Sequence, residues 1–353
     1  MRFGTPITAA ALILATVTAH GSHDVVEEIR ERRDFLGSQK RTSLSHCTEL
    51  LKARGLDQRN IQRRAATVSE ARSKRSLTRR AKADVLSISH NKTSYGYSEN
   101  TDAGTLFADY KSCLLTPQVT QGPYYVADEY VRRNISGDQE GVPIVLDMQV
   151  VDINTCEPMT DTYLEIWHAN STGVYSGVAV QGNGNGEDDL TNLNKTWGRG
   201  IQKTDADGVA QFESIFPGHY TGRAIHIHTV VQKNATLYEN STLGATTITS
   251  HIGQVFFEQD LISLVEATYP YTTNEQALTT NADDDIMTTE TETDGVDPVA
   301  EYVMLGDSVE DGIFAWIAFG VNSTFTKVMD PVVYLTEDGG VNNPNWDEDD
   351  GRP

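Results

Sequence analysis

The chain has 353 residues, with 28 Lys and Arg against 50 Asp and Glu, which gives a formal net charge of -22. Hydrophobic residues make up 38% and charged residues 22%, a composition typical of a folded globular protein rather than of a disordered one. The acidic balance argues against nucleic acid as the main partner. No apolar run reaches the length of a membrane span, and three cysteines are too few for a disulfide-rich scaffold.

Residues 1–19 have the pattern of a secretory signal peptide. Arg2 gives a basic start, and a stretch of small and aliphatic residues follows it. Val17-Thr18-Ala19 fits the small-residue rule for cleavage and would leave His20 as the new N-terminus. We therefore expect a secreted, extracellular protein.

Seven N-x-[ST] sequons lie beyond residue 90, none with proline at the middle position. Their asparagines are Asn91, Asn134, Asn170, Asn194, Asn234, Asn240 and Asn322. Together with the signal peptide, this number of sequons predicts a glycoprotein in which not every site is used.

Residues 20–95 are predicted to form a basic helical segment. Residues 1–90 hold 17 Lys and Arg against 9 Asp and Glu, so the acidic charge lies in the rest of the chain. The candidate processing sites in this segment are the paired basic residues Lys40-Arg41, Arg63-Arg64, Lys74-Arg75 and Arg79-Arg80. Two interpretations stay open: a pro-segment that is removed, or a helical pair that packs on the main domain.

Residues 96–335 predict an all-β domain, because short β-rich runs alternate with turn signals. The predicted strands are 144–151, 162–167, 200–204, 209–212, 224–231, 246–257, 313–321 and 332–335. Their spacing predicts an antiparallel β-sandwich core, to which the helical basic segment is added at the N-terminus.

The connections within this domain carry further predictions. Asp205-Ala206-Asp207-Gly208 suits a tight hairpin between two strands. A short helix is expected at 259–266 and a long loop at 272–298. An acidic, mobile tail is expected at 336–353.

The three cysteines are Cys47, Cys113 and Cys156. An odd number in a secreted chain leaves one of them unpaired or in an intermolecular bond. Cys113 and Cys156 could form a disulfide within the sandwich, but the sequence does not fix the pairing.

His226 and His228 form the sharpest chemical feature of the sequence. Side chains alternate along a strand, so these two imidazoles share one face and make a metal-binding pair. A lone His-x-His is more often an ordinary polar pair, but Tyr220 lies six residues upstream and Tyr175 precedes it. Phenolate is a hard anionic donor that suits Fe(III) better than Zn(II) or Cu(I).

These residues belong to an ordered set of motifs that resembles the intradiol ring-cleavage dioxygenases, most closely their secreted fungal relatives. The motifs are Thr116-Pro117 with Gly122-Pro123-Tyr124-Tyr125, then Gly173-Val174-Tyr175, then Arg199-Gly200 through Thr204-Asp205 and Gly208, then Pro217-Gly218-His219-Tyr220, then Arg223-Ala224-Ile225-His226-Ile227-His228. The likeness covers roughly residues 110–260.

The resemblance implies a secreted enzyme that uses dioxygen to cleave catechol-type rings between the two hydroxyl-bearing carbons, giving muconate-type products. It implies one Fe(III) bound by Tyr175, Tyr220, His226 and His228, without an organic cofactor.

The resemblance also implies roles for residues around the metal. Tyr220 would be the ligand released when substrate binds. Arg223 and Gln254 would lie near the substrate ring, where a fixed cation can stabilise negative charge and an amide can orient the ring. Because Arg223 lies three residues before His226, it must sit at an irregular strand entrance, after Thr221-Gly222, to reach that ring.

Departures from the family pattern leave substrate identity and oligomeric state open. The interval between Tyr220 and His226 is short, residues 233–250 look like an insertion, and a helical dimerisation module is not evident. The alternatives are a non-catalytic β-sandwich that binds aromatic or metal ligands, or a cell-wall structural glycoprotein. A metal-dependent hydrolase is less favoured because phenolate donors are unusual for zinc.

Overall fold

The computed structural model describes residues 30, 44–75, 91, 112–113, 121–244, 246–291 and 296–346. The predicted signal peptide, the paired basic residues at 40–41 and 79–80, and residues 347–353 lie outside this part of the chain. No helix in the described residues is long and apolar enough to cross a membrane.

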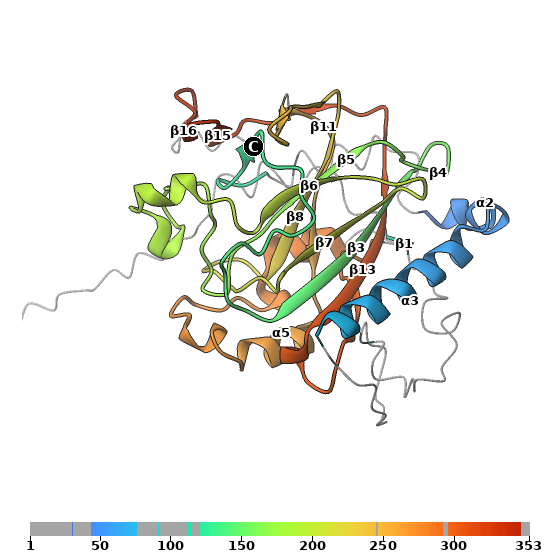
Figure 1. Cartoon of the computed structure of the whole chain (residues 1–353), viewed down its shortest axis with the longest axis horizontal. Coiled ribbons are helices and arrows are strands. Elements are labelled where there is room, and N and C mark those ends of the chain that lie inside the picture. The colour runs from blue at the N-terminus through green and yellow to red at the C-terminus, as the bar shows by residue number, and fades with distance from the viewer. Residues whose placement is uncertain are drawn as a thin grey trace, which may run out of the picture.

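A six-stranded sheet forms one half of the β domain (Figure 1). Its strands are β1 (Ser112–Cys113), β3 (Pro143–Asp152), β4 (Glu157–Pro158), β7 (Val209–Ile215), β12 (Glu301–Met304) and β13 (Ile313–Val321). The central strands β3 and β13 run parallel, from Ile144 opposite Ile313 to Asp152 opposite Val321. The expectation of an antiparallel sheet is therefore wrong at the centre, because the long chain between these strands lets β13 return in the same direction.

A five-stranded sheet carries the histidine pair. Its order is β14 (Lys327–Val328), β11 (Ile248–Phe256), β8 (His226–Gln232), β5 (Tyr163–Trp167) and β6 (Arg199–Lys203). β8 is antiparallel to both of its neighbours. The register places Gln254 of β11 and Trp167 of β5 directly opposite His228.

The turn at Asp205–Gly208 joins the two sheets instead of closing a hairpin. The Oδ1 atom of Asp205 accepts hydrogen bonds from the backbone N–H of Asp207 and Val209, and Gly208 has a φ of 74°. The turn is thus as tight as its sequence predicts. However, β6 pairs with β5 and β7 pairs with β3, so the hairpin prediction is wrong.

Both sheets bury one face in a shared hydrophobic core. Alternate residues of β3 and β13, such as Leu146 and Ile317, contribute to it from the first sheet. Ile227 of β8, Ile166 of β5 and Val255 of β11 contribute from the second. Because side chains alternate along a strand, this fixes the opposite face of β8 as the one that carries His226 and His228.

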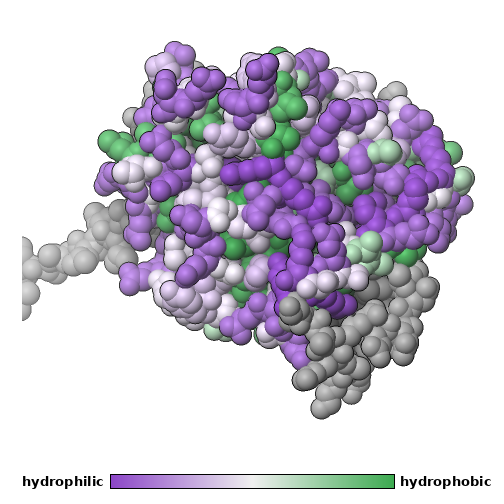
Figure 2. All heavy atoms as spheres, viewed as in Figure 1, coloured by the Kyte–Doolittle hydropathy of each residue, from purple (hydrophilic) through white to green (hydrophobic). Residues whose placement is uncertain are grey.

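The described part of the basic segment packs on the outer face of the six-stranded sheet. It consists of η1 (Ser45–Cys47), α2 (Thr48–Ala53) and α3 (Leu56–Lys74), and Figure 1 shows α3 lying along β3 and β13. Val68 and Ala71 of α3 share a hydrophobic cluster with Phe314 and Trp316 of β13. From the same side, the molecular surface is mostly hydrophilic, with hydrophobic side chains in small separate patches (Figure 2). These helices pack on the β domain, and removal of the segment by proteolytic processing stays a prediction.

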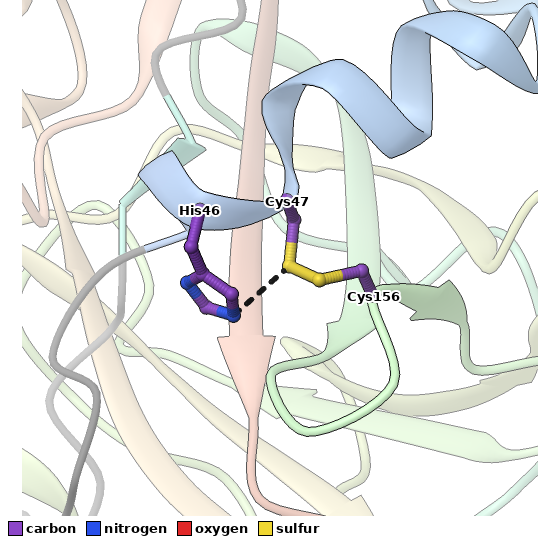
Figure 3. A group of neighbouring side chains, drawn as sticks. All are labelled: His46, Cys47 and Cys156. Carbon is purple, nitrogen blue, oxygen red and sulfur yellow. Dashed lines mark hydrogen bonds between the residues drawn. A yellow bond between two sulfur atoms is a disulfide. The ribbon is translucent and has the colours of Figure 1, made fainter.

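A disulfide links this segment to the β domain. The sulfur atoms of Cys47 and Cys156 are bonded (Figure 3), across a sequence separation of 109 residues. The pairing of Cys156 with Cys113 that the sequence allows is therefore wrong. His46 Nε2 lies 3.3 Å from Cys47 Sγ, but both sulfur atoms are in the disulfide and offer no thiolate to a metal.

The remaining elements lie around these sheets. They are β2 (Val126–Ala127), η3 (Gly184–Gly186), η4 (Leu190–Asn194), β9 (Thr236–Leu237), β10 (Leu243–Gly244), α5 (Gln259–Glu266), η5 (Tyr271–Thr273), η6 (Asn281–Asp283), α6 (Asp285–Thr291), η7 (Val309–Asp311), β15 (Val333–Thr336) and β16 (Gly339–Asn342). Helix α5 matches its predicted bounds. β15 and β16 form a hairpin, so the chain is folded beyond residue 336, where a mobile tail is expected.

Candidate metal centre

Strand β8 places His226 and His228 side by side beneath a layer of aromatic side chains. Both imidazoles are buried, 2% and 1% exposed. The indole of Trp167 stacks on His228, with ring centroids 4.6 Å apart and an interplanar angle of 1°. This stacking restricts the orientation of the His228 ring.

Tyr175 reaches the same place from an irregular loop held by asparagines. Asn183 Oδ1 accepts a hydrogen bond from Tyr175 N at 2.7 Å, and Asn183 Nδ2 donates to Tyr175 O at 2.9 Å. Asn192 Nδ2 donates to the same carbonyl at 2.7 Å. Gly173 has a φ of 76°, and a Cβ there would collide with the carbonyl of His219. Only glycine allows the Tyr175 loop to approach the Tyr220 loop this closely.

Tyr220 lies in the turn that leads into β8. Its hydroxyl oxygen is 3.4 Å from His226 Nε2, and its ring centroid is 5.5 Å from that of Tyr175. Gly222 has a φ of 90°, and Arg223 forms an isolated bridge with Tyr220 before the strand begins at His226. The predicted irregular strand entrance is confirmed.

The donor atoms of these four side chains fit a metal ion. His226 Nδ1 lies 2.7 Å from the carbonyl oxygen of Ala224, so it carries the proton and leaves a lone pair on Nε2. The Nε2 atoms of His226 and His228 are 3.0 Å apart, about the separation of two nitrogens that bind one ion at about 2.1 Å and at right angles. The hydroxyl oxygen of Tyr175 is buried. Two phenols and two imidazoles suit Fe(III).

Burial keeps both phenols protonated when no metal cation is bound. It raises the pKa of Tyr175 well above its ordinary value, and the neighbouring Tyr220 raises it further. Burial also raises the pKa of Tyr220 to about 12, although the Arg223 cation opposes the rise. A bound metal cation would lower both pKa values, because its positive charge stabilises the phenolate form of each hydroxyl.

Arg223 and Gln254 lie together beside these residues. Arg223 is 4% exposed, and its Nη2 donates to Gln254 Oε1. Its Nε donates to Asp284 Oδ2 at 2.8 Å. Arg223 is therefore part of a buried ion pair rather than of an exposed surface salt bridge.

The segment predicted as a long loop at 272–298 fastens the two tyrosine-bearing loops. Gln276 Nε2 donates to the carbonyls of Thr172 and Gly173, and its Oε1 accepts from the N–H of Thr221. Asn274 Nδ2 donates to the His219 carbonyl at 2.7 Å. Gln276 thus joins the loop of Tyr175 to the loop of Tyr220, and no sequence motif identified it.

Two further residues, Tyr124 and Arg199, hold Tyr175 and its loop in place, and the sequence did not predict this supporting role. Tyr124 stacks on Tyr175, with ring centroids 4.4 Å apart. The buried Arg199 donates to the carbonyls of Tyr124 and Ser176. Tyr124 and Arg199 both lie in the ordered set of motifs, so membership of those motifs was the sequence signal for them. The role of each side chain depends on contacts that only the fold creates.

The other histidines of the domain lie outside this cluster. His168 Nδ1 and Nε2 lie 2.8 Å from the Ala169 carbonyl and from Ser214 Oγ. His219 lies between Glu266 and the Gln276 carbonyl. His251 faces the other way and stacks on Phe319. None is placed to join His226 and His228 as a ligand.

Comparisons with known proteins identify a dioxygenase domain in this chain. Residues 119–292, which include all four candidate ligands, match the family described as Dioxygenase. Catechol 1,2-dioxygenase 1 of Acinetobacter lwoffii is 34% identical over 110 residues, and the catechol 1,2-dioxygenase of Acinetobacter baylyi is 29% identical over 110 residues. The matched part is 30% of this chain and 32% of each relative, so the chain spans about a third of their length.

Solved structures give related matches. An intradiol ring-cleavage dioxygenase from Tetranychus urticae is 27% identical, with a TM-score of 0.48, over 60% of this chain and 95% of that one. Catechol 1,2-dioxygenase from Pseudomonas arvilla C-1 is 17% identical, with a TM-score of 0.37, over 66% of each chain. The sequence matches at 119–292 define a dioxygenase domain. Residues 119–292 thus form a domain of the intradiol ring-cleavage dioxygenase family.

Proposed function

We propose that this protein is an Fe(III)-dependent dioxygenase that cleaves catechol-type rings between the two hydroxyl-bearing carbons. The observation that carries the proposal is the convergence of Tyr175, Tyr220, His226 and His228 from three separate segments in a chain of this family. The two sheets around the shared core would be the β-sandwich that the family resemblance implies.

Ferric iron bound there would make a chelated catecholate reactive toward dioxygen, both of whose oxygen atoms would enter a muconate-type product. The chain's own residues position the reactants. In this proposal Tyr220, which is a phenolate when a metal cation is bound, accepts a proton at Oη from a substrate hydroxyl.

Arg223 and Gln254 would serve the substrate ring rather than the metal. The planar guanidinium is always charged, so it can stabilise negative charge that develops on the ring. Gln254 accepts from Arg223 and lies opposite His228. An amide held in this way can orient a ring bound next to the histidine pair.

Iron content and the visible spectrum of the purified protein test this proposal. We expect about one iron per chain, a visible tyrosinate-to-iron charge-transfer band, and oxygen uptake with catechol that yields the ring-opened dicarboxylate. A protein loaded with iron that shows no such band, or that consumes no oxygen with any catechol supplied, would contradict it.

We further propose that the protein is secreted and glycosylated at its exposed sequons. Asn134, Asn194, Asn234 and Asn240 have exposed side chains. Asn170 differs because its Nδ2, the atom that would carry a glycan, donates to Gln139 at 2.9 Å.

Asn170 is therefore expected to stay unmodified in active protein. Its Oδ1 accepts hydrogen bonds from the N–H of Thr172 and Val174, which shape the turn leading into Tyr175. A glycan would replace one of the two hydrogens on Nδ2 and place a sugar next to the contact with Gln139, which would disturb this turn. Peptide mapping of the secreted protein checks this expectation, and the same experiment identifies its N-terminus. Full occupancy at Asn170 in active enzyme would contradict it.

A further inference from the structure

Asp284 is a buried carboxylate in an otherwise exposed acidic stretch. It lies between η6 and α6 and is 0% exposed, whereas Asp283 and Asp285 on either side are exposed. Its Oδ2 accepts from Arg223 Nε at 2.8 Å and from the Ala224 backbone N–H at 2.7 Å. The carboxylate therefore binds both the side chain of Arg223 and the adjacent backbone N–H of Ala224.

These contacts form a chain that ends next to a candidate ligand. Asp284 holds the Nε edge of the Arg223 guanidinium, and the Nη2 atom of the same guanidinium donates to Gln254. Gln254 lies opposite His228 in the register of β11 and β8. A guanidinium held at two edges by planar acceptors has a fixed plane and direction.

The burial of this pair indicates a purpose beyond holding the fold together. A buried charge is costly unless it is paired, and a well-packed apolar pair of the same volume often stabilises a fold as well. Asp284 orients the Arg223 cation next to the candidate metal ligands. This buried pair therefore fits a positioning role for Asp284 better than a purely stabilising one.

We propose that Asp284 is the positioning residue for Arg223, fixing its guanidinium in the direction of the substrate ring and offsetting part of its charge. This inference rests on the proposed function. Asp284 touches neither the candidate ligands nor the substrate. Its effect passes through Arg223, so it should appear in turnover and substrate affinity but not in iron binding.

Asp284 also has a structural role, the capping of α6, which the experiment has to distinguish from the positioning of Arg223. Asp284 Oδ1 accepts from the Met287 N–H at 2.7 Å, so the side chain also caps α6. Asparagine caps helices about as well as aspartate. Asp284→Asn therefore keeps the cap while it removes the charge that pairs with Arg223.

The experiment compares three variants with the iron-loaded wild type. Asp284→Asn removes the charge, Asp284→Glu keeps it but moves the carboxylate by one methylene, and Asp283→Asn makes the same charge change on the exposed neighbour as a control. Iron content, the visible band, kcat, and the anaerobic affinity for catechol, followed through the band, are measured for each.

We expect Asp284→Asn and Asp284→Glu to keep the band and iron content while kcat/KM falls by about tenfold to a hundredfold. Asp283→Asn should match wild type. Because Asp284→Glu keeps the buried charge paired, it remains informative if Asp284→Asn does not fold. Wild-type kinetics in either folded Asp284 variant would reduce Asp284 to a cap and overturn the inference. Loss of iron would show that it serves the metal instead. A wild type without band or turnover would defeat the proposed function itself, and this inference with it.

Discussion

Tyr175→Phe is expected to weaken or remove the visible band and to lower turnover by at least about a hundredfold. The substitution keeps the ring that stacks on Tyr124 but deletes the buried oxygen proposed to bind iron. Changes to residues that merely support metal ligands already cost about tenfold to a hundredfold, so loss of a ligand atom should cost more. Metal analysis, the visible spectrum and oxygen uptake with catechol measure the effect.

Tyr124→Phe is the matched control. It removes one hydroxyl from the other ring of the same stack and leaves every proposed ligand in place. We expect iron content and the band to stay at wild-type level in this variant. If Tyr175→Phe kept its iron and its spectrum, Tyr175 could not be a ligand, and the proposed ferric site would have to be abandoned.

The sequence predicted most of the strands because their residues follow local rules. β13 and α5 match their predicted bounds, and β3, β5 and β8 lie within one or two residues of theirs. The same-face histidine pair also followed from strand alternation alone. What alternation does not specify is the partner of each strand, so the parallel pairing of β3 with β13 and the crossing between sheets after β6 were missed.

The candidate site shows the same limit. Its proposed ligands lie in motifs and could be named, whereas the residues that hold them in place could not. Gln276 and Asp284 belong to a Thr-, Asp- and Glu-rich stretch that has no periodicity, and they meet Thr221 and Arg223 only after folding. The Cys47–Cys156 disulfide is a further long-range contact of this kind.

Arg63 and Arg64, one of the paired basic sites, are expected to be essential for stability. Arg63 Nε and Nη2 donate to the two oxygens of Asp147 at 2.9 and 3.0 Å, and Arg64 Nε lies 3.2 Å from Oδ1. Asp147 is 0% exposed, at the centre of β3 beneath α3. Replacing both arginines by alanine leaves a buried carboxylate without its cations, which should lower the free energy of unfolding by about 3–5 kcal/mol.

Arg59→Ala provides the control on the same helix. Arg59 pairs with Asp207 at 2.7 Å, but its side chain is 47% exposed. An exposed pair of this kind contributes about 0–1 kcal/mol. Urea unfolding of the three proteins checks the comparison. If the double variant lost no more stability than Arg59→Ala, the packing of α3 on the sheet would not depend on this ion pair. Such a result would favour the interpretation of the basic helical segment as a pro-segment that is removed.

The same pair predicts a change of stability with pH. Burial alone would raise the pKa of the Asp147 carboxyl, but Arg63, together with Arg64, outweighs burial and lowers it to about 2. The unfolded-state pKa is about 3.9, so the carboxylate stabilises the fold fully above about pH 4. This contribution, on the order of 2 kcal/mol, is lost as the pH falls from about 4 towards 2. Asp147→Asn removes the titrating group, so its unfolding free energy should fall less than that of wild type across this range. Parallel curves for the two proteins between pH 5 and pH 2 would contradict the assignment of this acid-sensitive step to Asp147.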